Sequence, residues 1–138
     1  MNAAGIQLIP VRGIGEIRPG DVLAEVILAT GAGVRDGDVV VVTQKAVSKA
    51  EGRLEPIDPD DPLAHKALVE RESVRVLRRR GDLVISETAH GVVCANAGID
   101  LSNVERGYAA LLPLDADRSA RRIRDGQRAR AGVEVGVV

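Results

Sequence analysis

Four consecutive valines at positions 39–42 constrain the fold of this chain more than any other feature. They follow the turn signal Arg35-Asp36-Gly37-Asp38, whose glycine and aspartates favour a reversal of the backbone. β-Branched side chains favour extended backbone, and an unbroken apolar run is typical of a strand covered on both faces. The run therefore predicts a buried strand of the kind found in α/β proteins.

Tyr108 is the only aromatic residue in the 138-residue chain, so a core must be built from valine, leucine, isoleucine and alanine. Without aromatic rings, the chain has no platform on which nucleic-acid bases can stack. The formal net charge of −1 gives no overall attraction to nucleic acid or to an anionic membrane. We therefore expect no nucleic-acid partner, and we interpret the arginine-rich segments 78–80 and 118–130 as solvated surfaces.

The length suits one domain with one core, and the sequence contains no internal repeat and no linker. No apolar run approaches the roughly 20 residues that span a bilayer. The N-terminus lacks the basic and then apolar segments of a signal peptide. Cys94 is the only cysteine, which excludes an internal disulfide. We expect a cytoplasmic protein without a membrane partner.

Apolar periodicity and chain breakers predict the remaining elements. Asp21 is a potential cap for a helix that ends at Gly31 and Gly33, and Asp117 for a helix that ends at Gly132. Residues 63–80 are also expected to be helical. Residues 43–53 form a polar, positively charged segment, and residues 56–62 form a loop rich in proline and aspartate. Further strands are expected at residues 6–11, 82–86, 91–94, 111–114 and 133–138.

Lys45, Ser48 and Lys49 follow the predicted buried strand directly. Ligands of α/β proteins bind at the carboxyl ends of such strands, and two ammonium groups there could neutralise phosphate oxygens. The alternative is a solvated basic loop.

Asp100 ends a run of small residues that follows an apolar segment, and Asn103 comes three residues later. A carboxylate on such a loop can bind a hard cation and leave room for phosphate oxygens in the coordination shell. The alternative is a turn, in which aspartate and asparagine side chains are common.

Several familiar sites are absent from the sequence. It has no Walker A motif and no G-x-G-x-x-G, and His65, His90 and Cys94 lack the spacing of zinc ligands. As same-face residues of one strand, His90 and Cys94 would lie about 13 Å apart at ~3.3 Å per residue, too far for direct proton transfer. We interpret Cys94 as a small buried thiol and His90 as an exposed imidazole, and no side chain is identified as catalytic.

The segments that carry these features resemble one family in their order and spacing. They are residues 36–42, the run Val47-Ser48-Lys49-Ala50-Glu51-Gly52-Arg53, residues 91–100 with Ala95-Asn96-Ala97-Gly98-Ile99-Asp100, the triplet Ser102-Asn103-Val104, and residues 111–115. This pattern is similar to the F420-0:gamma-glutamyl ligases, including the N-terminal domains of the bifunctional actinobacterial form. The resemblance runs from about Gly5 to Val138.

The resemblance implies a mixed α/β (α+β) fold with a mixed sheet and flanking helices, in a protein that forms homodimers. It implies GTP-dependent addition of L-glutamate to the deazaflavin F420-0, and to its polyglutamate tail, through an acyl phosphate, releasing GDP and phosphate. Mg²⁺ or Mn²⁺ would assist, with K⁺ as a further candidate ion. By residue match, Asp100 is a metal ligand, and the nucleotide contacts are Ile14, Gly15, Glu16, Ile17, Gln44, Lys45, Lys49 and Asn103.

The sequence departs from the family pattern at two places. Ile14-Gly15 stands where the family has Leu-Pro or Ile-Pro. The family's second half, with an Asp-Thr or Asp-Ser metal-binding pair, is not in this sequence, which ends in a predicted strand at Val138. We therefore expect residues 1–138 to be the N-terminal portion of a ligase domain that does not complete the ligation alone. The alternative is a homologue that only binds nucleotide or dimerises, without catalysis.

Overall fold

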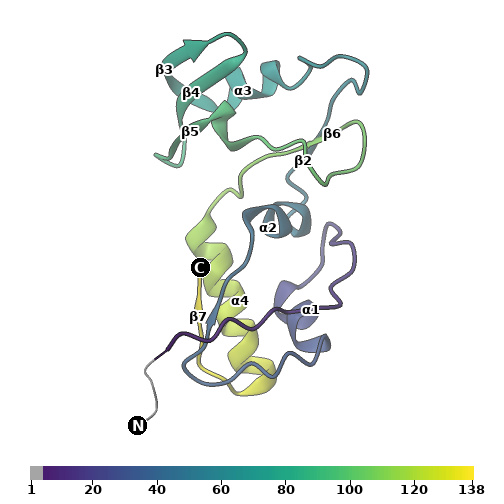
Figure 1. Cartoon of the computed structure of the whole chain (residues 1–138), viewed down its shortest axis with the longest axis vertical. Coiled ribbons are helices and arrows are strands. Elements are labelled where there is room, and N and C mark those ends of the chain that lie inside the picture. Colours follow the sequence, from purple (N-terminus) through teal and green to yellow (C-terminus); the bar gives the residue numbers. More distant parts are fainter. Residues whose placement is uncertain (1–4) are drawn as a thin grey trace.

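The computed structural model describes residues 5–138. Its elements in chain order are α1 (Leu23–Ala29), β1 (Val39–Val40), α2 (Gln44–Ala50), β2 (Leu54–Pro56), α3 (Lys66–Glu72), β3 (Ser73–Arg80), β4 (Leu83–Thr88), β5 (Val93–Ala95), the 3-10 turn η1 (Asn96–Gly98), β6 (Tyr108–Ala110), α4 (Ala116–Ala131) and β7 (Gly136–Val137). The molecule is elongated, with α1, α2, α4, β1 and β7 in a lower lobe and α3, β3, β4 and β5 in an upper lobe (Figure 1).

The strands form small sheets within the part of the chain that the structure describes. β1 pairs with β7 in parallel, β2 pairs with β6 antiparallel, and β3, β4 and β5 form an antiparallel sheet in that order. The β2–β6 pair lies where the two lobes meet (Figure 1). The mixed α/β class expected from the sequence is confirmed.

The lower lobe depends on close packing between α1 and α4. A methyl group placed on Gly126 of α4 would lie only 2.6 Å from the Cβ of Ala24 in α1, so a larger residue does not fit without movement. The surrounding core is aliphatic, as the near absence of aromatic residues predicts. It consists of Leu23, Ile27, Val40, Val47, Ile123 and Val135.

The prediction of a strand covered on both faces at residues 39–42 is wrong. β1 contains only Val39 and Val40, which lie opposite Gly136 and Val137 of β7. Val40 is 8% exposed, whereas Val39 and Val41 are 61% and 77% exposed. Side chains alternate across a strand, and only the face that carries Val40 joins the core.

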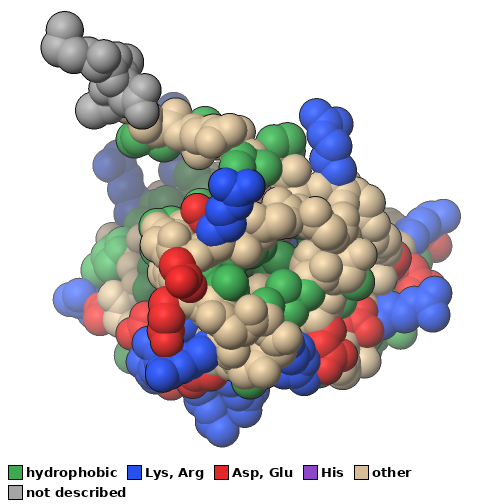
Figure 2. Space-filling model, turned by 90° about the horizontal axis from the view of Figure 1, so that it is seen from below, with side chains coloured by type: hydrophobic (Ala, Val, Ile, Leu, Met, Phe, Trp, Pro, Cys, Tyr) green, Lys and Arg blue, Asp and Glu red, His purple; other side chains and the backbone are tan. Residues whose placement is uncertain are grey.

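The strand predicted at residues 6–11 is also not present, because this segment has no regular secondary structure. Ile6 and Leu8 are 94% and 88% exposed, so the segment does not enter the core. Apolar side chains alone do not make a strand, since its N–H and C=O groups need a neighbouring strand. Figure 2 shows the chain next to the grey residues at the margin of the molecule, with apolar side chains facing solvent.

The helices expected near Asp21 and Asp117 are present, but neither aspartate is the cap. The Asp21 carboxylate instead accepts a hydrogen bond, 2.7 Å long, from the backbone N–H three residues before it. The cap of α4 is Asp115, whose carboxylate accepts a 2.8 Å hydrogen bond from the N–H three residues after it. Gly31 and Gly132 follow the ends of α1 and α4 as predicted, both at a φ of +69° that glycine adopts readily.

The helix predicted at residues 63–80 is wrong in its second half. Only α3 is helical, and from Ser73 onwards the chain forms β3, which pairs antiparallel with β4. The Ser73 hydroxyl donates to the carbonyl of Val69 at 2.6 Å, and the ladder with β4 satisfies the backbone groups that a helix would satisfy internally. Residues 78–80 lie in β3 and are exposed, as expected for a solvated surface.

The predictions for the remaining strands are mixed. Residues 82–86, 91–94 and 133–138 overlap β4, β5 and β7 and are confirmed in part. Residues 111–114 are not a strand, because the antiparallel pairing with β2 uses the three residues just before them, in β6. Within residues 5–138, no helix has both the length and the apolar character needed to cross a membrane.

The close contact at Gly126 gives a test of the lower lobe. Gly126→Ala should lower the free energy of unfolding by about 1–3 kcal/mol, because the new methyl overpacks the α1–α4 contact. Intrinsic helix propensity alone would raise stability by about 1 kcal/mol, so the two effects have opposite signs. Urea unfolding of the variant decides between them.

The matched control is Gly126→Ala combined with Ala24→Gly, which removes the methyl that the new side chain meets. The double variant should lose less free energy of unfolding than the two single variants lose when their losses are added. A stabilised Gly126→Ala single variant would contradict the helix contact described here.

Candidate functional site

The basic segment after β1 is helix α2, not a solvated loop. Ser48 has no exposed surface, and Lys49 is 8% exposed although it is charged. Lys45 and Lys49 are four residues apart and therefore lie on one face of the helix. Helix formation thus brings two ammonium groups to the same side of α2.

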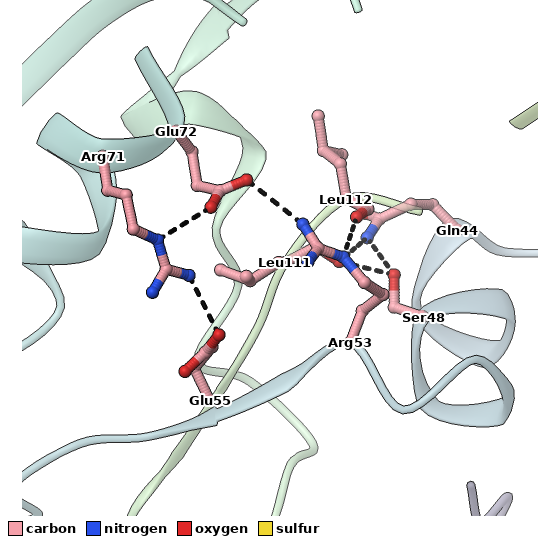
Figure 3. A network of polar contacts seen from close by, with 8 residues as sticks. All are labelled: Gln44, Ser48, Arg53, Glu55, Arg71, Glu72, Leu111 and Leu112. Atoms are coloured by element: carbon pink, nitrogen blue, oxygen red, sulfur yellow. Dashed lines mark hydrogen bonds and ion pairs between the residues drawn. The ribbon is translucent and has the colours of Figure 1, made fainter. Parts of the chain in front are cut away.

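The carbonyl of Leu111, just after β6, fixes the position of α2. The Ser48 hydroxyl donates to it at 2.6 Å, and the Gln44 side-chain amide donates to it at 3.2 Å (Figure 3). Gln44 also donates to the Ser48 hydroxyl at 2.8 Å. Since the contact is buried, water does not compete for these hydrogen bonds, and α2 is held against the chain that leaves β6.

Arg53 extends this contact from the lower lobe to the upper lobe. Its guanidinium donates to the carbonyl of Leu112 at 3.0 Å and to Glu72, at the end of α3, at 3.1 Å (Figure 3). Arg71 joins the same network by pairing with Glu72 and with Glu55 of β2, each at 3.0 Å. Nothing in the sequence spacing marks Arg53 for this role, because its partners Leu112 and Glu72 lie 59 and 19 residues away.

Asp100 is presented by a sharply turned backbone. Asn96, Ala97 and Gly98 have φ values of 47°, 52° and 73°, so three successive residues are left-handed. The turn is held by the Asn96 carboxamide oxygen, which accepts from the N–H of Val84 at 3.1 Å. Gly98 leaves room for Leu112, because a methyl at that glycine would lie 2.7 Å from the leucine side chain.

Two backbone hydrogen bonds then fix Asp100 beside β6. The N–H groups of Asp100 and Ala110 each donate to the other residue's carbonyl at 2.9 Å. Leu111, which holds α2, is the next residue after Ala110. One short stretch of chain therefore positions both Asp100 and the helix that carries the lysines.

Lys45 meets Asp100 at this junction. The Lys45 ammonium lies 2.9 Å from Oδ2 of Asp100 and donates to the Ser102 hydroxyl at 2.8 Å. Ser102 in turn donates from its hydroxyl and its N–H to Oδ1 of Asp100, each at 2.8 Å. Oδ1 of Asp100 therefore takes part in the turn that was the alternative interpretation of this residue. Oδ2 pairs with the ammonium of Lys45.

The pKa of Asp100 reflects these contacts. Burial is the largest single effect and raises the pKa, but the hydrogen bonds from Lys45 and Ser102 together outweigh it and lower the pKa below its ordinary value. The carboxylate is therefore ionised throughout the neutral range. Ser102 was not proposed as a site residue from the sequence, although its position two residues after an aspartate is typical of such turns.

Lys49 pairs with a second segment of the chain. Its ammonium donates to the carboxylate of Glu16, which lies in the loop before α1. Ile17 of this loop packs against the lower core, whereas Ile14 is exposed, and a side chain at Gly15 would meet nothing within 4 Å. The structure thus brings the loop of residues 14–17 to α2 through Glu16.

Asn103 lies at the surface close to Asp100 in the sequence. It has a φ of 52° and an exposed side chain, three residues after Asp100.

Elsewhere, His90 is exposed, and the half-buried Cys94 has a pKa that burial raises. Within residues 5–138, no three side chains of histidine, cysteine, aspartate or glutamate cluster as metal ligands, so a metal at Asp100 would find at most two such ligands in this part of the chain.

Comparison with known proteins identifies the class of protein to which this chain belongs. A family model described as F420-0:gamma-glutamyl ligase matches residues 13–138, and the chain belongs to that family. The resemblance noted in the sequence is confirmed.

Curated relatives point to one kind of ligase. The coenzyme F420:L-glutamate ligases of Methanopyrus kandleri and Methanothermobacter thermautotrophicus are 40% and 39% identical, over 96% and 97% of this chain. The enzyme of the same name from Archaeoglobus fulgidus is 39% identical over 96% of the chain. The chain spans 58–60% of the length of these relatives.

The contacts of Asp100 predict its titration. Its carboxyl should titrate below the ordinary aspartate value of 3.8 in metal-free buffer, and the pKa should rise in Lys45→Met, which removes one of the hydrogen bonds that lower it. The free energy of unfolding that ionised Asp100 contributes is fully present above the pKa that this carboxyl has in the unfolded chain. It is lost as the pH falls through the lower pKa of the same carboxyl in the folded chain. Carboxyl-carbon NMR measures the pKa in both proteins.

Lys49→Met is the control for this titration, because Lys49 pairs with Glu16 and has no contact with Asp100. It should leave the Asp100 pKa close to that of the parent protein. An unchanged pKa in Lys45→Met would contradict the ion pair.

Proposed function

We propose that this chain forms the part of a coenzyme F420:L-glutamate ligase that binds GTP and a divalent cation. The observation that carries the proposal is the arrangement of Lys45 and Lys49 on one face of α2, each against a carboxylate from a different segment. Such a surface can accept the phosphates of a nucleotide while its carboxylates exchange lysine for a metal ion.

The two lysines suit phosphate binding. A lysine ammonium is a compact charge on a flexible stem, and it binds phosphate oxygens as a point charge without fixed geometry. Lys49 is held close to the core, so its charge acts from a defined place, while Glu16 comes from an exposed loop. Phosphoryl transfer depends mainly on positioning and charge neutralisation, which these residues supply.

The donor atoms around Asp100 fit Mg²⁺ or Mn²⁺. The Asp100 carboxylate and the Ser102 hydroxyl are hard oxygen donors close together in space. Magnesium is usually held by one or two carboxylates together with substrate phosphates, so a single carboxylate here is consistent with a site shared with nucleotide. When bound, the ion would neutralise charge on the transferred phosphoryl group. The same oxygen donors also suit K⁺, though with less selectivity.

The proposed reaction has two steps and needs no protein nucleophile. A carboxylate oxygen of F420-0 takes the γ-phosphoryl group of GTP, giving an acyl phosphate and GDP. The amine of L-glutamate then attacks the acyl carbon, phosphate leaves, and an amide forms. The substrates, the homodimer and the cytoplasmic location are proposed by analogy with the family.

The second candidate is a homologue that binds nucleotide without ligation; the two lysines that would bind the phosphates both belong to this part of the chain. A coupled assay for GDP release, run on a protein that carries this chain together with the family's second half, distinguishes the two functions. Release that requires both F420-0 and L-glutamate supports the ligase. GTP binding by that longer protein without such release supports the nucleotide-binding candidate.

Lys49→Met tests the nucleotide site by calorimetry with GTP and Mn²⁺. GTP binding should weaken at least tenfold, because a hydrogen bond to a charged group contributes about 1.5–3 kcal/mol. The fold should persist, since Glu16, the partner left unpaired, is 67% exposed.

The third lysine in the sequence provides the matched control. Lys66 lies in α3, where its ammonium donates to the carbonyl of Asp82 and, at 3.5 Å, to the Asn96 carboxamide oxygen, which the N–H of Val84 also holds. Lys66→Met should leave GTP affinity within a factor of two of the parent. Equal GTP affinities for Lys49→Met and the parent protein would contradict the proposed site.

A further inference from the structure

Both oxygens of the Asp100 carboxylate are already occupied by groups of the protein itself. Oδ1 accepts two hydrogen bonds from Ser102, and Oδ2 pairs with the Lys45 ammonium at 2.9 Å. The ammonium also lies 2.8 Å from the Ser102 hydroxyl oxygen. The positively charged Lys45 ammonium therefore lies between the Asp100 carboxylate and the Ser102 hydroxyl, where a bound metal ion would lie.

We propose that Lys45 is an internal counter-ion that competes with the divalent cation for Asp100. In the ligand-free protein the ammonium neutralises the carboxylate. Binding of the cation releases Lys45, which then binds a phosphate group of the nucleotide. This inference rests on the proposed function, because it assigns an order of contacts to the same site.

The competition follows from charge and distance. A magnesium ion coordinates carboxylate oxygen at about 2.0–2.1 Å. An ammonium that stayed in place would then lie next to a double positive charge in a half-buried setting, where like charges repel strongly. Ion and ammonium therefore exclude each other at Oδ2.

The position of Lys45 allows the exchange. Its stem belongs to α2, which is held by Ser48 and Gln44 through the Leu111 carbonyl, so the helix need not move. Four methylene groups let the ammonium swing while its backbone stays fixed. Ser102 remains bonded to Oδ1 through its backbone N–H and keeps the carboxylate oriented.

The exchange couples the two ligands. The cation alone must displace Lys45, so it binds weakly without nucleotide. Nucleotide phosphate binds the released ammonium and recovers that loss, so each ligand strengthens the other by the same factor. Lys49 has no part in this coupling, because its partner is Glu16.

The test is Mn²⁺ binding to the 138-residue chain, measured by the electron paramagnetic resonance signal of free Mn²⁺, with and without GTP and with the Mn²⁺ that GTP binds in protein-free solution subtracted. Lys45→Met should bind Mn²⁺ alone at least fivefold more tightly than the parent. The ratio of Mn²⁺ affinities with and without GTP should be smaller in Lys45→Met than in the parent, because only the direct bonds between Mn²⁺ and phosphate then couple the two ligands. Lys45→Gln is the second variant if the methionine side chain disturbs folding, and circular dichroism checks both.

Two further variants serve as controls. Lys45→Arg keeps the charge and should keep the weak binding of Mn²⁺ alone. Arg75→Met removes an exposed cation that pairs with Glu87 outside the site, and it should leave that binding within twofold of the parent. Binding of Mn²⁺ alone that is equal or weaker in folded Lys45→Met and Lys45→Gln would overturn the competition. Absence of Mn²⁺ binding in every protein, with and without GTP, would instead overturn the proposed metal site, and with it this inference.

Discussion

The carbonyl group of Leu111 is the point on which the rest of the site depends. It accepts hydrogen bonds from Ser48 and Gln44 of α2, residues more than 60 positions earlier in the chain. The same stretch, through Ala110, bonds the backbone of Asp100. Because one strand end holds both partners, Lys45 meets Asp100 without a large sheet to organise them. Removal of either donor would lower the free energy of unfolding, because the Leu111 carbonyl would stay buried with fewer hydrogen bonds.

The electrostatic state of the site follows from that geometry. Each lysine of α2 is matched by one carboxylate, Lys45 by Asp100 and Lys49 by Glu16, so the ligand-free site carries little net charge. A positive surface without these partners would repel a metal ion, and a negative one would repel phosphate. Paired charges avoid both kinds of repulsion. When a metal ion and a nucleotide bind together, the ion can take the place of lysine at the carboxylate, and phosphate can take the place of the carboxylate at the lysine. The same arrangement explains how a chain with a net charge of only −1 could bind a highly charged nucleotide.

Sequence reasoning succeeded where local chemistry decides the structure. The turn before β1 and the glycine stop of α4 depend on a few adjacent residues, and both are confirmed. It failed where pairing with another segment decides, as at residues 73–80, which form a strand because they pair antiparallel with β4. For the site, the resemblance supplied the residues but not their partners. The ion pairs of Lys45 and Lys49 join positions 55 and 33 residues apart, a separation that no local pattern reveals.

The most direct measurement of the central claim is GTP affinity, in the presence of Mn²⁺, of a Ser48→Ala variant. Ser48 is fully buried, so its hydroxyl can act on a ligand only through the position of α2. Loss of a hydrogen bond of about 1 kcal/mol that positions the lysines should weaken GTP binding about fivefold, with the helical content of the protein retained. Unchanged GTP affinity in a folded Ser48→Ala protein would show that the Leu111 contact does not build the site.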